Sequence, residues 1–212
     1  FVERSRISTI HPDGALLFNE GQPVTGVYLV LGGTAKVSIS SPQGKLLILR
    51  VARAGELLGI NAAMTGQPYQ ATAQAWRKCT TSFIPQADFI ALQQRDERFR
   101  EQVQVALSRY VVDLFEITRR LMLAESAAEK LASLLLRWCE EWGSVEPRGI
   151  RIIWEFTHED IAQMICVSRE TVTRLLGEFS KRGQIQLTGN SLLICEPQDL
   201  KEIATGKVLT VK

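Results

Sequence analysis

The chain has 212 residues, of which 45% are hydrophobic and 23% are charged, and its formal net charge is only +2. This composition is typical of a globular protein with one large domain or two domains of about 100 residues each. The sequence has no apolar run of about 18 residues and no secretory signal, so we expect a cytoplasmic protein without a membrane span.

Four cysteines and two histidines are present, and their spacing is unlike that of a metal site. The cysteines lie far apart without a C-x-x-C pair, which favours reduced, mostly buried thiols over disulfides or zinc. His11 and His158 are isolated in the sequence, and lone histidines are more often structural or exposed than catalytic. No P-loop or nucleophile–base motif appears. The sequence therefore predicts no metal site, and an enzyme is the function class that it favours least.

Residues from about 14 to 85 are β-rich runs separated by glycines. The runs read ALLF, GVYLVLGG, TAKVSIS and LLILRVA, followed after Gly66 and Pro68 by QATAQAWRKCTTSFI. Turn residues at intervals of about ten favour a sandwich or a rolled barrel over a parallel sheet with helices. We expect an N-terminal β domain.

A long helix is predicted next, because no Gly or Pro occurs between about Arg98 and Glu125. Its apolar residues follow alternating spacings of four and three, the a/d pattern of a coiled coil. The predicted seam consists of Val103, Leu107, Tyr110, Leu114, Ile117 and Leu121. This pattern predicts a two-stranded contact and a homodimer. The alternative is a helix that lies on the core of its own domain.

The stretch from Ser126 to Glu129 reads as a capping box, which starts a further helix that Gly143 and Pro147 end. We therefore predict three segments: a β domain over residues 1–95, a dimerisation helix over residues 96–125 and a second domain over residues 126–212.

The second domain contains a predicted helix-turn-helix. Thr157 and the acidic residues after it mark one helix start, and Ser168 marks another after a turn at Cys166 and Val167. Apolar side chains fall where the two helices would share a core, and small Ala162 allows close approach. The expected core residues are Ile161, Ile165, Val167, Val172 and Leu175. The run QIQLTGNSLLI then predicts a two-stranded wing around Gly189 and Asn190.

The outer face of the second helix has the side chains of a DNA reader. Residues 127–212 carry 11 basic and 12 acidic groups, yet Val167 to Gly183 holds four basic and two acidic ones. Arginine can pair with guanine, and glutamate can accept from cytosine. The expected base-reading residues are Arg169, Glu170, Thr173 and Arg174, and the expected DNA-backbone contacts are Thr157, Ser168, Lys181 and Arg182. The alternative is a solvated face with an ion pair between Glu170 and Arg174.

These stretches resemble the Crp/Fnr family of bacterial transcription regulators. LFNEGQPVTGVYLVLGGTAKVSI is similar to the family's β-roll, and FTHEDIAQMICVSRETVTRLLGEF is similar to its helix-turn-helix. The resemblance implies an α+β fold: an N-terminal β-roll (a double-stranded β-helix of the cyclic-nucleotide-binding type), a long dimerisation helix and a C-terminal winged helix-turn-helix. It also implies a homodimer that binds a two-fold symmetric site on double-stranded DNA and recruits or blocks RNA polymerase.

The chain departs from this family at the turn and at the effector site. Cys166 replaces the usual turn glycine, and the iron–sulfur cysteine cluster of the Fnr branch has no match in these residues. Whether residues before Phe1 add a cofactor site is left open. Cyclic-nucleotide binders use an Arg-Ser or Arg-Thr pair for the phosphate, and the matching positions here hold Tyr69 and Gln70. The ribose glutamate aligns with either Glu56 or Ile60.

A buried phosphate without its arginine would be poorly compensated. We therefore expect weak or no cyclic-AMP binding, and we assign no cofactor. The candidate effector-pocket residues are Glu56, Gly59, Ile60, Tyr69 and Gln70. These side chains either bind another small-molecule effector or simply fill the pocket.

The favoured function is a dimeric, sequence-specific transcription regulator whose β-roll senses a signal. One alternative keeps the DNA binding and makes the β-roll a scaffold without a ligand. Another is a winged-helix module that binds proteins. The effector, the target genes and the choice between activation and repression are left open by the sequence.

Overall fold

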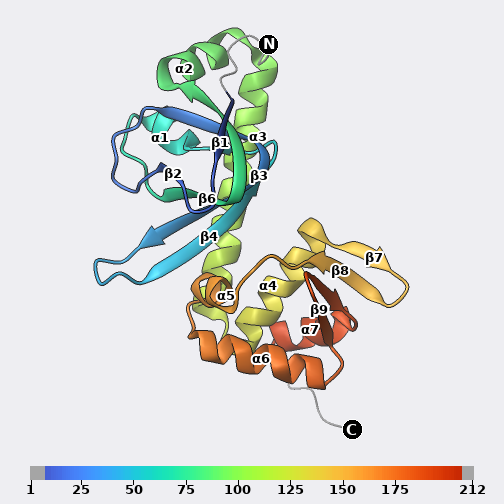
Figure 1. Ribbon diagram of the computed structural model, residues 1–212. Helices are drawn as coiled ribbons and strands as arrows, with labels where there is room; N and C mark the ends of the chain where they lie inside the picture. Colours follow the sequence, from blue (N-terminus) through green and yellow to red (C-terminus); the bar gives the residue numbers. More distant parts are fainter. Residues whose placement is uncertain (1–7, 207–212) are drawn as a thin grey trace. The chain divides into compact units, whose positions relative to one another are not determined.

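The computed structural model describes residues 8–206 and has the predicted α+β architecture (Figure 1). The chain divides into two compact units between Leu114 and Phe115, inside its longest helix. None of the helices in residues 8–206 is long and apolar enough to cross a membrane.

The first unit is a β-roll followed by helices. Its strands are β1 (Ser8–His11), β2 (Leu16–Phe18), β3 (Gly26–Ser40), β4 (Leu46–Arg53), β5 (Leu57–Leu58) and β6 (Thr72–Pro85). Its helices are α1 (Ile60–Thr65), α2 (Gln86–Arg95) and α3 (Glu97–Thr118). The strands pair antiparallel in the order β1-β6-β3-β4, while β2 also pairs with β6 and β5 with β3.

Strand β3 joins two runs that the sequence predicted as separate strands. The run GVYLVLGG and the run TAKVSIS form one strand, which pairs with β6 on both sides of a bulge at Gly32 and Gly33. Gly33 has a φ of 73°, and a side chain there would collide with the carbonyl of Lys78. The two glycines therefore bend a continuous strand rather than end it.

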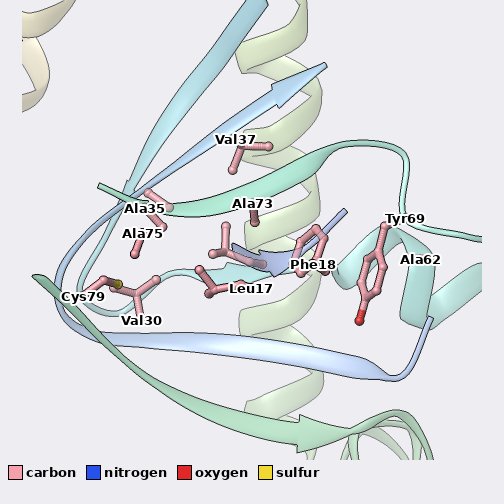
Figure 2. Close-up of a cluster of buried hydrophobic side chains, with 12 residues drawn as sticks. Leu17, Phe18, Val30, Ala35, Val37, Ala62, Tyr69, Ala73, Ala75 and Cys79 are labelled. Atoms are coloured by element: carbon pink, nitrogen blue, oxygen red, sulfur yellow. The ribbon is translucent and has the colours of Figure 1, made fainter. Parts of the chain in front are cut away.

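The interior of the roll is an apolar cluster that includes Leu17, Phe18, Val30, Val37 and Cys79 (Figure 2). These side chains come from β2, β3 and β6, so inward-facing residues of antiparallel neighbours fill the roll.

Helix α3 packs its predicted seam against its own unit. Val103 is only 1% exposed and lies in a cluster with Val27 and Phe89, against which Leu107 also packs. The prediction that Val103 faces a second chain is therefore wrong, and the alternative that the sequence left open, a helix lying on its own core, describes it correctly. Leu107 is only partly buried, so its contact with a second chain stays a prediction. Both arrangements need the same apolar period, so the spacing could not separate them.

The remaining seam residues have mixed surroundings. Tyr110 is half-buried, and the guanidinium carbon of Arg50 lies 4.5 Å from the centroid of its ring. Ile117 is buried and Leu121 is half-buried, whereas Leu114 is exposed. The six predicted residues therefore do not form one exposed stripe.

The second unit carries the helix-turn-helix and a small sheet. A π-helical turn η2 (Arg119–Leu123) continues α3, followed by α4 (Ala127–Trp142), β7 (Ser144–Glu146) and β8 (Gly149–Ile153). Then come α5 (His158–Ile165), α6 (Arg169–Lys181), β9 (Ile185–Thr188), β10 (Ser191–Ile194) and α7 (Pro197–Ala204). The strands pair antiparallel in the order β7-β8-β10-β9. Helix α4 contacts α5, α6 and α7, so it is the central support of this unit.

Helix α4 begins at the predicted capping residue. The Ser126 hydroxyl accepts from the Glu129 amide at 3.2 Å, and the Glu129 carboxylate accepts from the Glu125 amide at 2.9 Å. The glutamate thus accepts from the backbone amide of the residue before the cap, and its other oxygen accepts from the Ser126 hydroxyl at 2.8 Å. Trp138 on α4 then stacks on Phe156 at a centroid distance of 4.2 Å, which ties the helix to the segment that enters α5.

Candidate functional site

Helices α5 and α6 form the predicted helix-turn-helix on a shared apolar core. Thr157 caps α5 in a capping box with Asp160, and the Ser168 hydroxyl caps α6 by accepting from the Thr171 amide. Buried side chains from both helices fill the space between them and α4. These are Ile161, Ala162, Met164, Ile165, Val172, Leu175, Leu176 and Phe179. The predicted core member Val167 is only half-buried, because it lies in the turn.

The turn between the helices requires a left-handed residue, which is Cys166 here. Its φ is 55° and its ψ is 44°, and its amide bonds to the carbonyl of Ala162. A residue with a side chain in this region is strained by roughly 1–3 kcal/mol, which glycine avoids. Cys166 therefore adopts the left-handed conformation that the turn needs, and its backbone is strained as a result.

The four predicted base-reading residues lie on α6 and are exposed. The pKa of Glu170 is lowered by hydrogen bonds from its own backbone amide and from the Ser168 side chain, so this carboxylate stays ionised. Arg174 pairs with Glu178 at 2.7 Å. The ion pair considered in the alternative interpretation, between Glu170 and Arg174, is therefore not the one that the helix forms.

The predicted DNA-backbone contacts divide into two kinds. The hydroxyls of Thr157 and Ser168 are engaged as helix caps, and the Thr157 hydroxyl also donates to Asp160 at 2.6 Å. Lys181 and Arg182 are exposed at the end of α6, before the wing formed by β9 and β10. Lys181 and Arg182 are thus exposed, whereas the two hydroxyls are bonded within the protein.

His158 is a residue of this site that the sequence interpretation left out. It is the first residue of α5, and its Nδ1 lies 2.7 Å from the Thr173 hydroxyl on α6. Its place directly after the capping threonine was the available indication, since that position lies beside the recognition helix in a helix-turn-helix.

Tyr69, one of the predicted effector-pocket residues, is buried in the apolar cluster of the roll. Its ring stacks on Phe18 at a centroid distance of 3.9 Å and is 2% exposed (Figure 2). Its hydroxyl donates to the Gly26 carbonyl at 2.7 Å and accepts from the Gly26 amide at 3.3 Å. A Cβ at Gly59 would lie 2.8 Å from the ring, so glycine is needed there for the tyrosine to fit.

The other predicted pocket residues do not converge on Tyr69. Glu56 forms an ion pair with Arg50, and Ile60 is buried in the separate cluster beside α3. Gln70 is exposed and donates to the Pro68 carbonyl at 2.6 Å. Only Gly59 and Tyr69 of the five lie against each other. Within residues 8–206, no group of three or more His, Cys, Asp or Glu side chains could hold a metal ion.

Substitutions at Cys166 test the strain in the turn. We expect Cys166→Val to lower the free energy of unfolding by about 1–2 kcal/mol, because a β-branched residue tolerates positive φ poorly. Cys166→Gly should match or exceed the parent, since relief of strain offsets the added unfolded-state entropy. Urea unfolding measures both, and a valine variant as stable as the glycine variant would contradict the account.

Comparisons with known proteins agree with this geometry. A cyclic nucleotide-binding domain model matches residues 10–96, and a Crp-like helix-turn-helix domain model matches residues 129–203. The CRP-like cAMP-activated global transcriptional regulator of Mycobacterium tuberculosis is 26% identical over 206 residues, covering 89% of this chain and 84% of the relative. The global nitrogen regulator of Synechocystis sp. is 28% identical over 192 residues, covering 88% and 83%.

Solved structures share the fold. FixK2 from Bradyrhizobium japonicum superposes with a TM-score of 0.81 at 16% identity, covering 92% of this chain and 96% of that one. A CooA mutant from Carboxydothermus hydrogenoformans gives 0.82 at 24% identity, covering 93% and 87%. The two domain models occur in the family's order along most of the chain, and the chain belongs to the Crp/Fnr family of transcriptional regulators.

Proposed function

We propose that two copies of this chain bind an inverted-repeat DNA operator, with one α6 helix in the major groove of each half-site. The observation that carries this proposal is the exposed face of α6. It presents Arg169, Glu170 and Arg174 from a helix whose other face is buried in its own unit. Arginine and glutamate read base edges directly, while Lys181 and Arg182 supply phosphate contacts.

The proposed dimer uses exposed apolar side chains of α3 and of the π-helical turn η2 that continues it. Val112 is 59% exposed, Phe115 is 65% exposed and Met122 is 75% exposed. Val105 precedes Val112 by one heptad, and Phe115 precedes Met122 by one heptad, although the π-helical turn η2 alters the last spacing. Large apolar side chains that are exposed favour a covering partner. A second copy of the same helix would supply a matching face.

In this proposal the chain's three segments have separate roles. We assign the β-roll to the segment over residues 1–95, the dimer contact to residues 96–125 and DNA binding to residues 126–212. The regulator would act by recruiting or blocking RNA polymerase.

We further propose that the β-roll does not take cyclic AMP. Tyr69 stands at the sequence position where the family resemblance expects the phosphate-binding arginine, and its buried hydroxyl is bonded within the roll. This filling also favours a second candidate function, in which the β-roll is a scaffold and the dimer binds DNA without any effector.

Selection from random DNA should enrich inverted repeats with half-site centres about 10 bp apart. Arg169→Ala should then weaken operator binding by about 1–3 kcal/mol per contact and relax the preference at one base. Arg148→Ala, on the exposed turn between β7 and β8, is the matched control. Equal binding of all sequences before and after the Arg169 change would contradict base reading.

Phe115→Glu should convert the dimer to a monomer, because an apolar interface cannot compensate a buried carboxylate. Sedimentation equilibrium should show the mass fall from two chains to one. Gln102→Glu adds the same charge at an exposed position of α3 and should leave the mass unchanged. A Phe115→Glu protein that stays dimeric would show that this face is not the interface.

Titration calorimetry should detect no cyclic-AMP binding at micromolar concentration. Burying the cyclic phosphate would require displacing Tyr69 and would leave the anion without a bidentate cation. Micromolar or tighter affinity would overturn this expectation.

A further inference from the structure

The Thr173 hydroxyl on the recognition helix has two partners inside the protein. Its oxygen lies 3.0 Å from the Arg169 carbonyl oxygen, one turn earlier on α6. It also lies 2.7 Å from Nδ1 of His158 on α5. These contacts connect the two helices of the DNA-binding motif at its exposed face.

The directions of these two hydrogen bonds follow from the available hydrogens. A hydroxyl has one hydrogen, and the Arg169 carbonyl can only accept, so Thr173 donates to Arg169. His158 must then donate from Nδ1 to the Thr173 oxygen, which both the neutral Nδ1–H ring and the protonated ring can do.

This arrangement removes the threonine's ability to donate to DNA. Phosphate oxygens and the acceptors of the major groove all need a donor, and the only hydroxyl hydrogen of Thr173 is engaged. The other branch of the side chain is its methyl group, carried by an exposed residue between the base-reading residues Arg169 and Arg174. A threonine methyl recognises the C5-methyl of thymine by apolar contact.

We propose that Thr173 selects a thymine through its methyl group, and that His158 is the positioning residue that holds the threonine in the orientation needed. His158 is itself fixed, because it begins α5 directly after the capping box of Thr157 and Asp160. With both partners of its oxygen in place, Thr173 keeps one χ1 rotamer and presents the same group to every operator. This inference rests on the proposed DNA binding through α6.

Deoxyuridine is the probe, because it differs from thymidine only by the missing methyl. Each thymine of the selected operator is replaced in turn, symmetrically in both half-sites, and affinity is measured by fluorescence anisotropy. At one position per half-site the replacement should weaken binding about fourfold, and so about 15-fold for the symmetric pair. A wild-type protein that binds all uracil-substituted operators like the parent overturns the proposal.

Two substitutions at Thr173 separate its methyl from its hydroxyl. Thr173→Ser keeps the hydroxyl and should lose the preference for thymine over uracil at that position. Thr173→Val keeps a methyl and should retain the preference. A serine variant that still prefers thymine would show that the methyl is not what is read.

The role of His158 is tested by the same ratio rather than by affinity alone. His158→Ala should reduce the preference for thymine, while His158→Asn, whose amide places a donor near the position of Nδ1, should restore it. In the Thr173→Val background, His158→Ala should no longer change the ratio, because there is no hydroxyl left to hold. An unchanged ratio in His158→Ala with Thr173 intact would reject the positioning role.

The outcomes also distinguish this inference from the proposed function. A protein that selects no sequence from random DNA would refute the proposed function. A protein that selects an inverted repeat but ignores the thymine methyl would refute only the role of His158 and Thr173.

Discussion

Helix α3 carries apolar side chains on two sides, and each side needs a different contact to remove it from water. One face, which includes Val103 and Leu107, completes the core beneath the β-roll. The other exposes Val112 and Phe115, and Met122 is exposed on the π-helical turn η2 that follows. A single chain can cover only the first face, so the second favours association. In the proposed dimer, the contact between chains and the core of the β-roll would use different side chains of the same helix.

In the second unit, helix α6 is held in place on one side while its other side stays exposed. Capping at Thr157 and Ser168 satisfies the first amides of α5 and α6, and the buried side chains fix the angle between the helices. The strained residue Cys166 holds the turn. Two side chains on the polar face of α6 have partners inside the protein. Arg174 is paired with Glu178 and Thr173 with His158, and both contacts constrain the directions in which these side chains point.

The sequence was informative where the determinants are local. The capping residue Ser126, the helix-turn-helix and the wing at Gly189 follow from residues close together in the chain, and the structure has them at the predicted places. The predicted α+β class and the family resemblance are also confirmed. Gly32 and Gly33 led to the wrong prediction that a strand ends there, because a bulge and a strand end look alike in the sequence.

What could not be predicted depends on contacts between distant residues. The helical period gave two possible apolar faces on α3, and only the position of Val27 and Phe89 shows which face the core takes. Tyr69 was recognised as a departure from the family. Its stacking on Phe18, 51 residues earlier (69 − 18), could not be read from spacing. The contact between His158 and Thr173 is likewise a product of how two helices pack, since each residue alone looks unremarkable.

The central claim is that two chains together read one symmetric DNA site. Native mass spectrometry of the protein with a duplex carrying the selected inverted repeat tests it most directly. The account predicts two chains per duplex across a titration, with no abundant complex of one chain. A complex that saturates at one chain per duplex would contradict it.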